Sequence, residues 1–269
     1  MKTVMLYVAE DARQAASYEA ALTLVKALGA HLTCVQAAPF SAFVVTDPLG
    51  GIHPSVELLS NLEEQQDASR ARVTSRLAEA GVDAEWVRDQ GPPASVLLDH
   101  SRLSDLVILG HGSQEDRWNQ SLELAGDLAV HSRAPVLSVP HASGGFAPSG
   151  VAAIAWNGSF EAAQAVRLAV PLLRLASSVR ILTVADGNVA VPASAASTYL
   201  SRHSVQSEVL TLERGTGSVC ERLLKALQEE RAVYAVLGAY GHSRIRERLL
   251  GGVTRGMLLG SPIPLLLAH

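Results

Sequence analysis

The chain has few cysteines, few aromatic residues and a small net charge. These low values argue against several classes of protein. Its 269 residues include two cysteines, Cys34 and Cys220, and a reduced pair is favoured over a disulfide. Aromatic residues at 4% and a formal net charge of −4 argue against general nucleic-acid binding. No apolar run approaches the roughly 18 residues needed to span a bilayer, and residues 1–8 are too short for a signal peptide. These observations predict a soluble, cytoplasmic protein without a membrane partner.

Hydrophobic residues are plentiful by contrast, at 48% of the chain, and their spacing alternates between strand and helix patterns. Residues 106–109, Leu-Val-Ile-Leu, are typical of a buried parallel strand. A charged, amphipathic pattern over residues 54–80 predicts a long helix that ends at Gly81. The first half is expected to hold strands at 3–8, 31–36, 82–89, 106–109 and 135–139, and helices at 11–28, 54–80, 92–103 and 120–132.

A segment rich in small residues, glycine and proline, residues 141–150, has the composition of a linker. After it the order of strands and helices restarts. The expected strands are 151–156, 179–184, 205–213, 232–237 and 263–267, and the expected helices are 159–176, 192–203, 217–230 and a short one through 255–259. The pattern predicts two tandem α/β domains with five-stranded parallel sheets, residues 1–140 and 151–269. One domain with ten parallel strands is the alternative, and the linker argues against it.

The two halves also match each other locally. Leu106–Gly110 corresponds to Tyr234–Gly238, and Pro135 corresponds to Pro264, so the offset is 128 or 129 residues throughout. A constant offset of this kind indicates a duplication.

The most distinctive stretch is the glycine loop, residues 238–252, which joins an apolar strand pattern to the last helix. Glycines stand where the strand stops (Gly238, Gly241) and where the helix begins (Gly251, Gly252). Glycine allows positive φ and close approach of a ligand to the backbone, and free N–H groups at a helix start attract phosphate. The basic side chains in and beside the loop are His242, Arg244, Arg246, Arg248 and Arg255, opposed by Glu247. The loop is therefore predicted to bind phosphate; the alternative is a plain strand-to-helix turn with solvated arginines.

With these features the chain resembles the universal stress protein family in its tandem-domain form. The family fingerprint is Gly-x-x-Gly, nine residues, then Gly-Ser/Thr, and Gly238, Gly241 and Gly251 fit that spacing. The closing Val253-Thr254 and the proline-containing last strand pattern, residues 262–266, are similar as well. The resemblance covers essentially the whole chain.

The resemblance implies a fold and a ligand. The fold is the adenine nucleotide alpha hydrolase-like sheet of order 3-2-1-4-5 in each domain, with the last strands of the two domains paired across a pseudo-two-fold axis. The ligand is ATP, ADP or AMP, with or without Mg²⁺. Gly252 stands where the family usually has Ser or Thr, so phosphate binding is expected to be weakened or altered. The backbone N–H groups of Gly252 and Val253 and the hydroxyl of Thr254 remain as donors.

The start of the second domain is predicted to supply the other wall of the site. Strands 1 and 4 of a 3-2-1-4-5 sheet are neighbours where the winding reverses, and ligands bind at their carboxyl ends. The first strand of this half ends in Ala155, Trp156 and Asn157. The family usually has Asp at the position of Asn157, facing the nucleotide, and contacts the base with backbone groups at the position of Val184.

Other roles remain open for some of these residues. Asn157 and Ser159 both precede a helix and are N-cap candidates. Trp156 is also a core candidate. Tyr240 either covers a base or packs on the neighbouring copy.

The first domain departs from the fingerprint. Its fourth strand runs into Gly110-His-Gly-Ser, and Leu122 and Glu123 stand where the second has Gly251 and Gly252. A leucine fills space that the backbone approach requires, and a glutamate repels phosphate. His111 is open to a structural or a functional role. This half is expected to be a degenerate partner.

Three functions are weighed. The favoured one is a stress-response protein that binds an adenine nucleotide in its C-terminal domain and acts through an unknown protein partner. The second is a slow ATPase or phosphoryl-transfer protein, although neither a metal-positioning nor a nucleophile-orienting group is visible. The third is a nucleotide-free scaffold. At most weak ATP hydrolysis is expected, with no catalytic residue assigned.

Some features of the sequence are not assigned to a single role. The nine histidines lack metal-ligand spacing, so no built-in metal site is expected. The long apolar loop at residues 38–54 is open between a lid, an interface and a locally packed loop. The chain is expected to be a monomer with an internal pseudo-dimer, or a homodimer.

Overall fold

The computed structural model describes residues 1–9, 15–38, 44–46, 52–112, 120–143, 146–185, 190–240 and 252–269. The first half of the chain contains β1 (Thr3–Tyr7), α1 (Ala15–Leu28), β2 (His31–Ala38), β3 (Val44–Thr46), β4 (Ile52–Pro54), α2 (Val56–Glu79), β5 (Ala84–Gln90), α3 (Pro93–His100), the 3-10 turn η2 (Ser101–Leu103), β6 (Leu106–His111), α4 (Gln120–His131) and β7 (Val136–Pro140). The second half contains β8 (Val151–Ala155), α5 (Phe160–Leu173), β9 (Ser178–Val184), α6 (Ala193–Arg202), β10 (Ser207–Leu212), α7 (Val219–Glu229), β11 (Tyr234–Gly238), α8 (Gly252–Gly260) and β12 (Leu265–Ala268).

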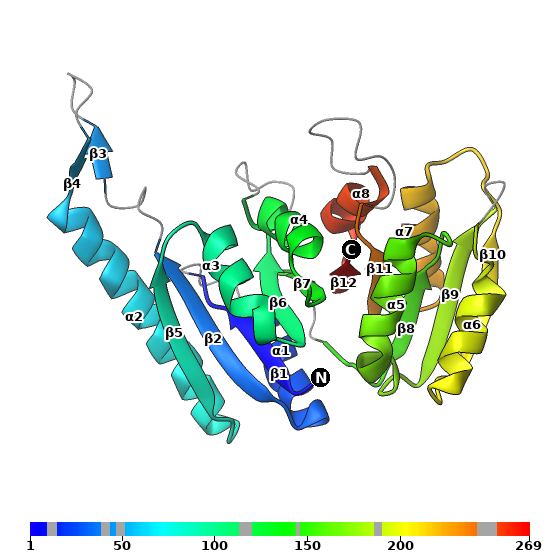
Figure 1. Cartoon of the computed structure of the whole chain (residues 1–269), viewed down its shortest axis with the longest axis horizontal. Helices are drawn as coiled ribbons and strands as arrows, with labels where there is room; N and C mark the ends of the chain where they lie inside the picture. Colours follow the sequence, from blue (N-terminus) through cyan, green and yellow to red (C-terminus); the bar gives the residue numbers. More distant parts are fainter. Residues whose placement is uncertain are drawn as a thin grey trace.

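Ten of these strands form one sheet, in the order β10-β9-β8-β11-β12-β7-β6-β1-β2-β5 (Figure 1). Within each half every pair is parallel and the order is 3-2-1-4-5. The last strands of the halves, β7 and β12, pair antiparallel in the middle of the sheet. The predicted order and the predicted pairing are therefore both confirmed, and the antiparallel pair excludes the alternative of ten parallel strands.

The register of the central pair shows where the pseudo-two-fold axis passes. Leu266 lies opposite Leu137, which is its own counterpart in the repeat. Leu265 lies opposite Ser138 and Leu267 opposite Val136, which places the neighbours symmetrically about the same point. The axis therefore runs through the Leu137–Leu266 pair, perpendicular to the sheet.

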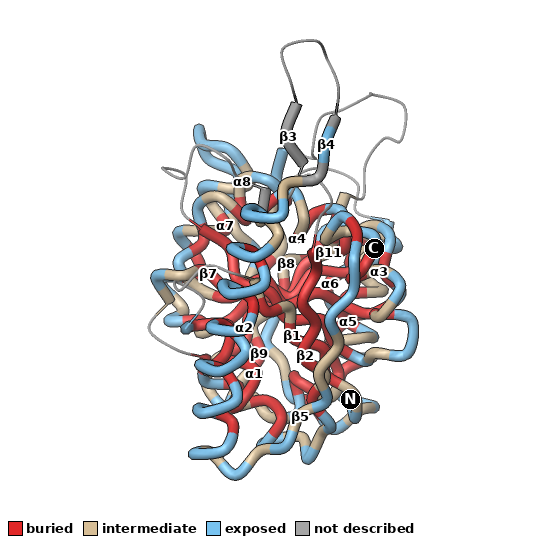
Figure 2. Tube along the Cα trace, turned by 90° about the vertical axis from the view of Figure 1, so that its left-hand side faces the viewer, coloured by how far each residue is buried: buried red, intermediate tan, exposed pale blue. Residues whose placement is uncertain are grey.

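Helices cover both faces of the sheet, so its strands are buried on both sides, as parallel strands require. Side chains of β1 alternate between the two cores: Val4 and Leu6 enter one, and Met5 enters the other. One face carries α1, α2, α5 and α6, and the other carries α3, α4, α7 and α8. Figure 2 shows the strands as a buried layer and the outer sides of the helices as exposed. Each core draws residues from both halves and is continuous across the axis.

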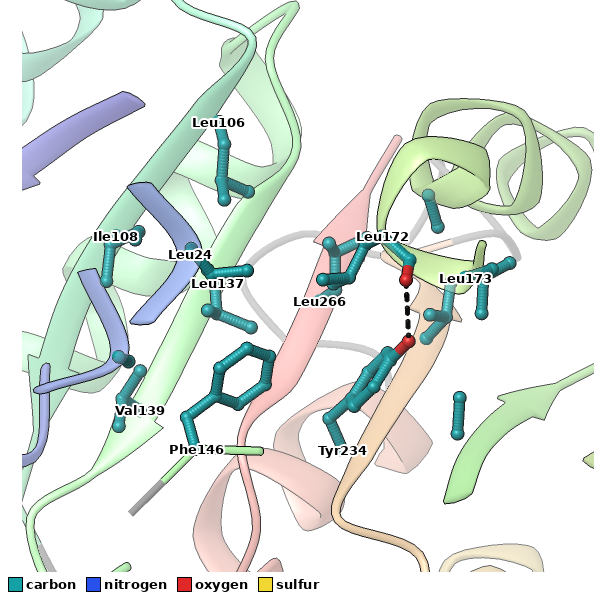
Figure 3. Packing of buried hydrophobic residues seen from close by; sticks show 14 of the residues in the cluster. Leu24, Leu106, Ile108, Leu137, Val139, Phe146, Leu172, Leu173, Tyr234 and Leu266 are labelled. Carbon is teal, nitrogen blue, oxygen red and sulfur yellow. Dashed lines mark hydrogen bonds between the residues drawn. The ribbon is translucent and has the colours of Figure 1, made fainter. Parts of the chain in front are cut away.

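The segment between the halves contributes to this continuity. Phe146 is buried and its ring lies 5.5 Å from that of Tyr234, beside Leu137 and Leu266 (Figure 3). The Tyr234 hydroxyl donates a hydrogen bond to the carbonyl of Leu172 at 3.3 Å. The segment predicted as a linker thus inserts an aromatic side chain into the core between the halves.

Short-range signals fix the helix starts. Ser55, Ser159 and Ser218 each accept a hydrogen bond from the backbone N–H three residues on, which satisfies one free donor of α2, α5 and α7. In α7 the carboxylate of Glu221 also accepts from the N–H of Ser218, which completes a capping box.

Part of the apolar stretch at residues 38–54 forms a two-stranded antiparallel hairpin, β3 with β4. The hairpin stands at the amino end of α2, away from the ten-stranded sheet (Figure 1). Among the described residues, no helix combines the length and apolar character that crossing a membrane demands. Cys34 and Cys220 are both free thiols.

Candidate functional site

The carboxyl ends of three strands meet where the second half of the sheet reverses its winding. Ala155, the last residue of β8, lies opposite Leu237 of β11 on one side and Leu182 of β9 on the other. Val184 ends β9 on the same edge. In parallel sheets of this order, ligands bind in the crevice at this position. The structure therefore brings Ala155, Val184 and the end of β11 together, as the sequence predicts.

The amino end of α8 lies beside the end of β11. The backbone N–H of Tyr240 donates to the hydroxyl oxygen of Thr254 at 3.4 Å, which ties the strand end to the first turn of the helix. Thr254 is buried, whereas Gly252 and Val253 are exposed. The first N–H groups of a helix have no acceptor within it, so the exposed start of α8 offers donors to an anion.

Gly238 and Gly252, the first and last glycines of the loop, are glycines for different reasons. A Cβ on Gly238 would lie 2.5 Å from the backbone nitrogen of Ala162, because the first turn of α5 crosses β11 there. A Cβ on Gly252 would meet no atom of the described part of the chain within 4 Å. Packing therefore excludes a side chain at Gly238, whereas the described residues leave room for one at Gly252.

Tyr240 has a left-handed backbone, with φ of 62°, which is uncommon for a residue with a bulky side chain. Its ring packs against the core on the α8 face, and its hydroxyl has no hydrogen-bond partner among the described residues. Burial raises the pKa of Tyr240 to about 12; the carboxylate of Asp127 adds to that rise and Arg255 opposes it. Asp127 belongs to α4 of the first half, so a charge of the neighbouring copy acts on Tyr240.

Asn157 begins a tight turn between β8 and α5. Its side-chain oxygen accepts from the N–H of Ser159 at 3.1 Å, and Gly158 has a φ of 74°. Ser159, the second N-cap candidate, is the observed N-cap of α5. The Asn157 side chain is exposed at the strand end and still has two amide donors that carry no charge.

Trp156 points into the core. It is buried, and its indole N–H donates to the carbonyl of Val191 at 2.9 Å. Its backbone N–H donates to the carbonyl of Leu182 at 2.8 Å. Its side chain therefore holds the segment before α6 against the end of β8, and any ligand contact at Trp156 falls to its backbone.

Four of the predicted site residues, Gly241, His242, Arg244 and Gly251, lie outside the described residues. The described part of the predicted site consists of Ala155, Trp156, Asn157, Val184, Gly238, Tyr240, Gly252, Val253 and Thr254.

The equivalent position of the first half is arranged differently. Leu122 is buried in the core between the sheet and α4, and Glu123 is exposed in the first turn of that helix. The backbone N–H of Gly112, just after β6, donates to the hydroxyl of Ser121 at 3.3 Å. The first half thus has a tie between strand end and helix similar to that from Tyr240 to Thr254, but it has a buried leucine and an exposed carboxylate where the second half has glycines.

Sequence reasoning missed the most deeply buried polar pair near this edge, His111 with Ser138. The His111 Nδ1 lies 2.8 Å from the Ser138 hydroxyl, and both side chains are buried. Burial, with the neighbouring His141, lowers the pKa of His111 to about 4. A histidine directly after an apolar strand was the available signal, but the sequence does not show what it faces. No group of three or more His, Cys, Asp and Glu among the described residues is placed to hold a metal ion.

Comparison with solved structures gives the fold family. A universal stress protein from Archaeoglobus fulgidus DSM 4304 superposes with a TM-score of 0.74 at 15% identity, covering 99% of this chain and 96% of that one. A protein described as a putative universal stress protein from Pseudomonas aeruginosa UCBPP-PA14 gives 0.64 at 13%, covering 100% and 93%. A shorter one from Arabidopsis thaliana, solved with AMP bound, gives 0.31 at 14%, covering 45% and 92%.

These likenesses establish the fold: the chain has the α/β architecture of the universal stress proteins, and two-domain structures match it over nearly their full length. No protein-family model matches the sequence, and no curated protein matches it.

Proposed function

We propose that the chain is a tandem universal stress protein that binds an adenine nucleotide in its second half. The observation that supports this most is the meeting of three features at one edge of the sheet. These are the adjacent carboxyl ends of β8 and β11, the exposed start of α8, and the hydrogen bond from Tyr240 to Thr254 that holds them together. The resemblance to the universal stress proteins is the reason for proposing an adenine base. The free N–H groups at the start of α8 are the reason for proposing that phosphate binds there.

In this proposal each part of the ligand has its own contacts. The backbone N–H groups of Gly252 and Val253 donate to phosphate, together with Gly241, His242, Arg244 and Gly251 of the glycine loop. Asn157 contacts the ribose with an uncharged amide, and the backbone at Ala155 and Val184 contacts the base. The ligand is ATP, ADP or AMP, and Mg²⁺ accompanies it only through the phosphates.

The proposed output is binding rather than turnover. Nucleotide occupancy changes the surface that this edge of the sheet offers to a protein partner. The second half contains all the proposed contacts, and its last strand, β12, already pairs with β7 of the same chain. A single chain is therefore the proposed binding unit.

The test exploits the space at Gly252. Gly252→Glu copies Glu123 of the first half: the carboxylate repels phosphate, yet an acidic residue in the first turn stabilises a helix. Gly252→Gln has the same shape without the charge. Calorimetric titration with ATP, ADP and AMP, each with and without Mg²⁺, is expected to show binding by the unmodified chain and by Gly252→Gln. Gly252→Glu is expected to bind about tenfold more weakly or not at all, as one like-charge contact at this range costs about 1 kcal/mol or more.

Thermal unfolding of the three proteins without ligand separates charge from stability, since Gly252→Glu is expected to unfold no earlier than Gly252→Gln. Equal affinity of the two variants would overturn the placement of phosphate at α8, and no binding by the unmodified chain would overturn the function. An assay for released ADP then distinguishes a binder from a slow ATPase.

A further inference from the structure

Asn157 is followed by a glycine, and it is the one asparagine in the sequence with that neighbour. The four asparagines stand at positions 61, 119, 157 and 188, and the other three precede leucine, glutamine and valine. The pair Asn157–Gly158 lies between β8 and α5, outside any helix or strand, and the Asn157 side chain is exposed. The end of β8 thus presents an amide side chain to water beside the least hindered kind of backbone nitrogen, since glycine has no Cβ.

The turn keeps the side-chain carbonyl of Asn157 folded over the backbone that follows it. Its Oδ1 atom accepts from the N–H of Ser159 at 3.1 Å, and this bond closes a ring that contains the nitrogen of Gly158. Gly158 is buried with a φ of 74°, and nothing among the described residues accepts a hydrogen bond from its N–H. A buried donor without an acceptor is unfavourable, so a reaction that removes this N–H relieves a cost.

These contacts suit an attack of the Gly158 nitrogen on Cγ of Asn157. A C–N bond forms, the bond from Cγ to Nδ2 breaks, and the Gly158 amide proton leaves through solvent with the departing nitrogen as ammonia. The product is a five-membered cyclic imide, whose nitrogen has no hydrogen. Negative charge develops on Oδ1 during the attack, and the N–H of Ser159 already donates to that atom. One water molecule then opens the ring at either carbonyl and leaves aspartate or isoaspartate.

From this arrangement we propose that Asn157–Gly158 is a self-modifying site, at which the neutral amide of Asn157 becomes a carboxylate without an enzyme. The sum of the two steps is the loss of ammonia and the gain of water, so solvent is the only other reactant. Both products carry a negative charge, and isoaspartate also adds a carbon atom to the backbone of the turn.

The consequence for the ligand rests on the proposed function. Ala155 of β8 lies opposite Leu237 of β11, so residue 157 stands at the same edge of the sheet as the start of α8. A carboxylate there accepts hydrogen bonds but no longer donates them, and it repels phosphate. Because the repulsion grows with the charge of the ligand, the modification disfavours ATP more than AMP.

The first measurement needs no nucleotide. The full chain and a peptide of residues 153–163 are kept at pH 7, and mass spectrometry of proteolytic fragments follows residue 157 over several weeks. The folded chain is expected to react within about a hundredfold of the peptide rate, whereas a reaction that requires global unfolding is slower by about a thousandfold or more. If Asn157 reacts more slowly than this limit while the peptide converts, burial protects the Gly158 nitrogen and the inference is wrong.

Two controls separate the turn from general hydrolysis. Asn61 is also exposed, but it lies inside α2, where helical backbone engages the following N–H, and it is expected to stay intact in the same sample. Asn157→Gln keeps an amide with one more methylene group, so the attack would have to close a six-membered ring, and its amide is expected to persist. Conversion at Asn61 or in Asn157→Gln at the rate of Asn157 would contradict the role of the turn.

The second measurement uses Asn157→Asp as the modified chain. Calorimetry without Mg²⁺ is expected to show that the ratio of ATP affinity to AMP affinity falls by roughly fivefold or more relative to the unmodified chain. Asn61→Asp adds the same charge on α2 and is expected to leave the ratio unchanged. An equal ratio in the unmodified chain and Asn157→Asp would contradict the effect on the ligand.

Failure of the proposed function looks different. A chain that binds no nucleotide but converts at Asn157 keeps the modification and loses the function. A chain that binds ATP and keeps its Asn157 amide retains the function and loses the inference.

Discussion

At the scale of single residues, the glycines at the two ends of the glycine loop, Gly238 and Gly252, differ in how tightly their surroundings are packed. Gly238 is held by packing, since the backbone of α5 lies where its Cβ would stand. At Gly252 an added Cβ would meet no atom of the described residues within 4 Å, so packing among them leaves that position open to a side chain. A hydroxyl at residue 252, where the fingerprint that the sequence resembles has Ser or Thr, can therefore be introduced without a clash with those residues.

Gly252→Ser is predicted to strengthen nucleotide binding by roughly fivefold, because a hydroxyl that donates to a charged phosphate adds about 1 kcal/mol or more. Gly252→Ala controls for the altered backbone entropy and the added Cβ. Calorimetry with ADP is the measurement. Equal affinity for the Ser and Ala variants contradicts the assignment of residue 252 to phosphate.

Gly238→Ala is predicted to destabilise the fold by roughly 1–3 kcal/mol, the usual cost of a group forced into a packed site. The contact that opposes it is the 2.5 Å approach to the Ala162 nitrogen, which belongs to backbone and does not yield easily. Urea denaturation checks it, with Gly252→Ala as the matched glycine variant that is expected to change stability by less. If Gly238→Ala leaves the free energy of unfolding unchanged, α5 can move to accommodate the added methyl group.

Residue-scale chemistry was only partly predictable. The fingerprint spacing singled out Gly238 from the sequence and marked Gly252 as a departure. It did not show why position 238 is a glycine, since that depends on where α5 crosses β11. The positive φ of Tyr240 was equally hidden, because tyrosine has no intrinsic preference for that conformation. The buried position of Trp156 depends on its contact with Val191, 35 residues away.

At the scale of elements, α8 is held between two neighbours. On one side α7 approaches it closely: a Cβ on Gly256 would lie 2.7 Å from the sulfur of Cys220, and one on Gly260 would lie 2.9 Å from Leu224. On the other side lies α4 of the first half. The placement of the helix that starts the proposed site is thus set by small residues toward α7 and by packing against α4.

Gly256→Ala is predicted to destabilise the chain by roughly 1–3 kcal/mol through overpacking against Cys220. Cys220→Ala removes the sulfur and leaves the Cβ, which would stand 3.3 Å from the new methyl group. The double variant is therefore expected to recover part of the loss, as a negative interaction energy in a double-mutant cycle from urea denaturation. Additive effects would mean that α7 and α8 do not meet at these residues.

The helices and strands were more predictable than any other feature of the structure. Hydrophobic periodicity, helix caps and the glycines that end helices are all local signals in the sequence. The ten sheet strands and the helices between them agree with such patterns, with boundaries shifted by a few residues. The β3–β4 hairpin was not anticipated, since its three-residue strands are too short to give a period. The order 3-2-1-4-5 came from the family resemblance, as local patterns carry no information on which strands pair.

At the scale of the whole molecule, the halves are joined by a shared sheet and two shared cores. The buried imidazole of His111 makes stability depend on pH, because burial disfavours its charged form. The folded pKa of His111, about 4, lies below the ordinary value of 6.5, so the unfolded chain binds more protons between these values. Stability from this group is fully present above pH 6.5 and is lost as the pH falls toward about 4.

The predicted loss is roughly 3 kcal/mol, at about 1.4 kcal/mol for each unit of pKa shift. Urea denaturation at pH 7 and at pH 4.5 measures it as the difference between the unmodified chain and His111→Gln, which does not titrate. His31→Gln, at an exposed histidine, serves as the control and is expected to keep the pH dependence of the unmodified chain. A His111→Gln curve parallel to the unmodified one contradicts the buried, neutral state of the ring.

The central strand pair makes a further prediction about the second half alone. Residues 151–269 without the first half expose β12, whose Leu265, Leu266 and Leu267 are fully buried in the intact chain. An exposed, apolar edge strand is a template for pairing with another chain. Because the pseudo-two-fold axis passes through Leu266, two copies of β12 can adopt the register that β7 and β12 have now.

The fragment is therefore expected to form a dimer through β12, seen as a doubled mass in light scattering that persists on dilution into the micromolar range. Leu266→Lys places two like charges face to face on the axis and is expected to abolish the dimer, whereas Val209→Lys on the outer edge strand β10 leaves it intact. A folded monomeric fragment would mean that the second half does not need the first half to cover β12.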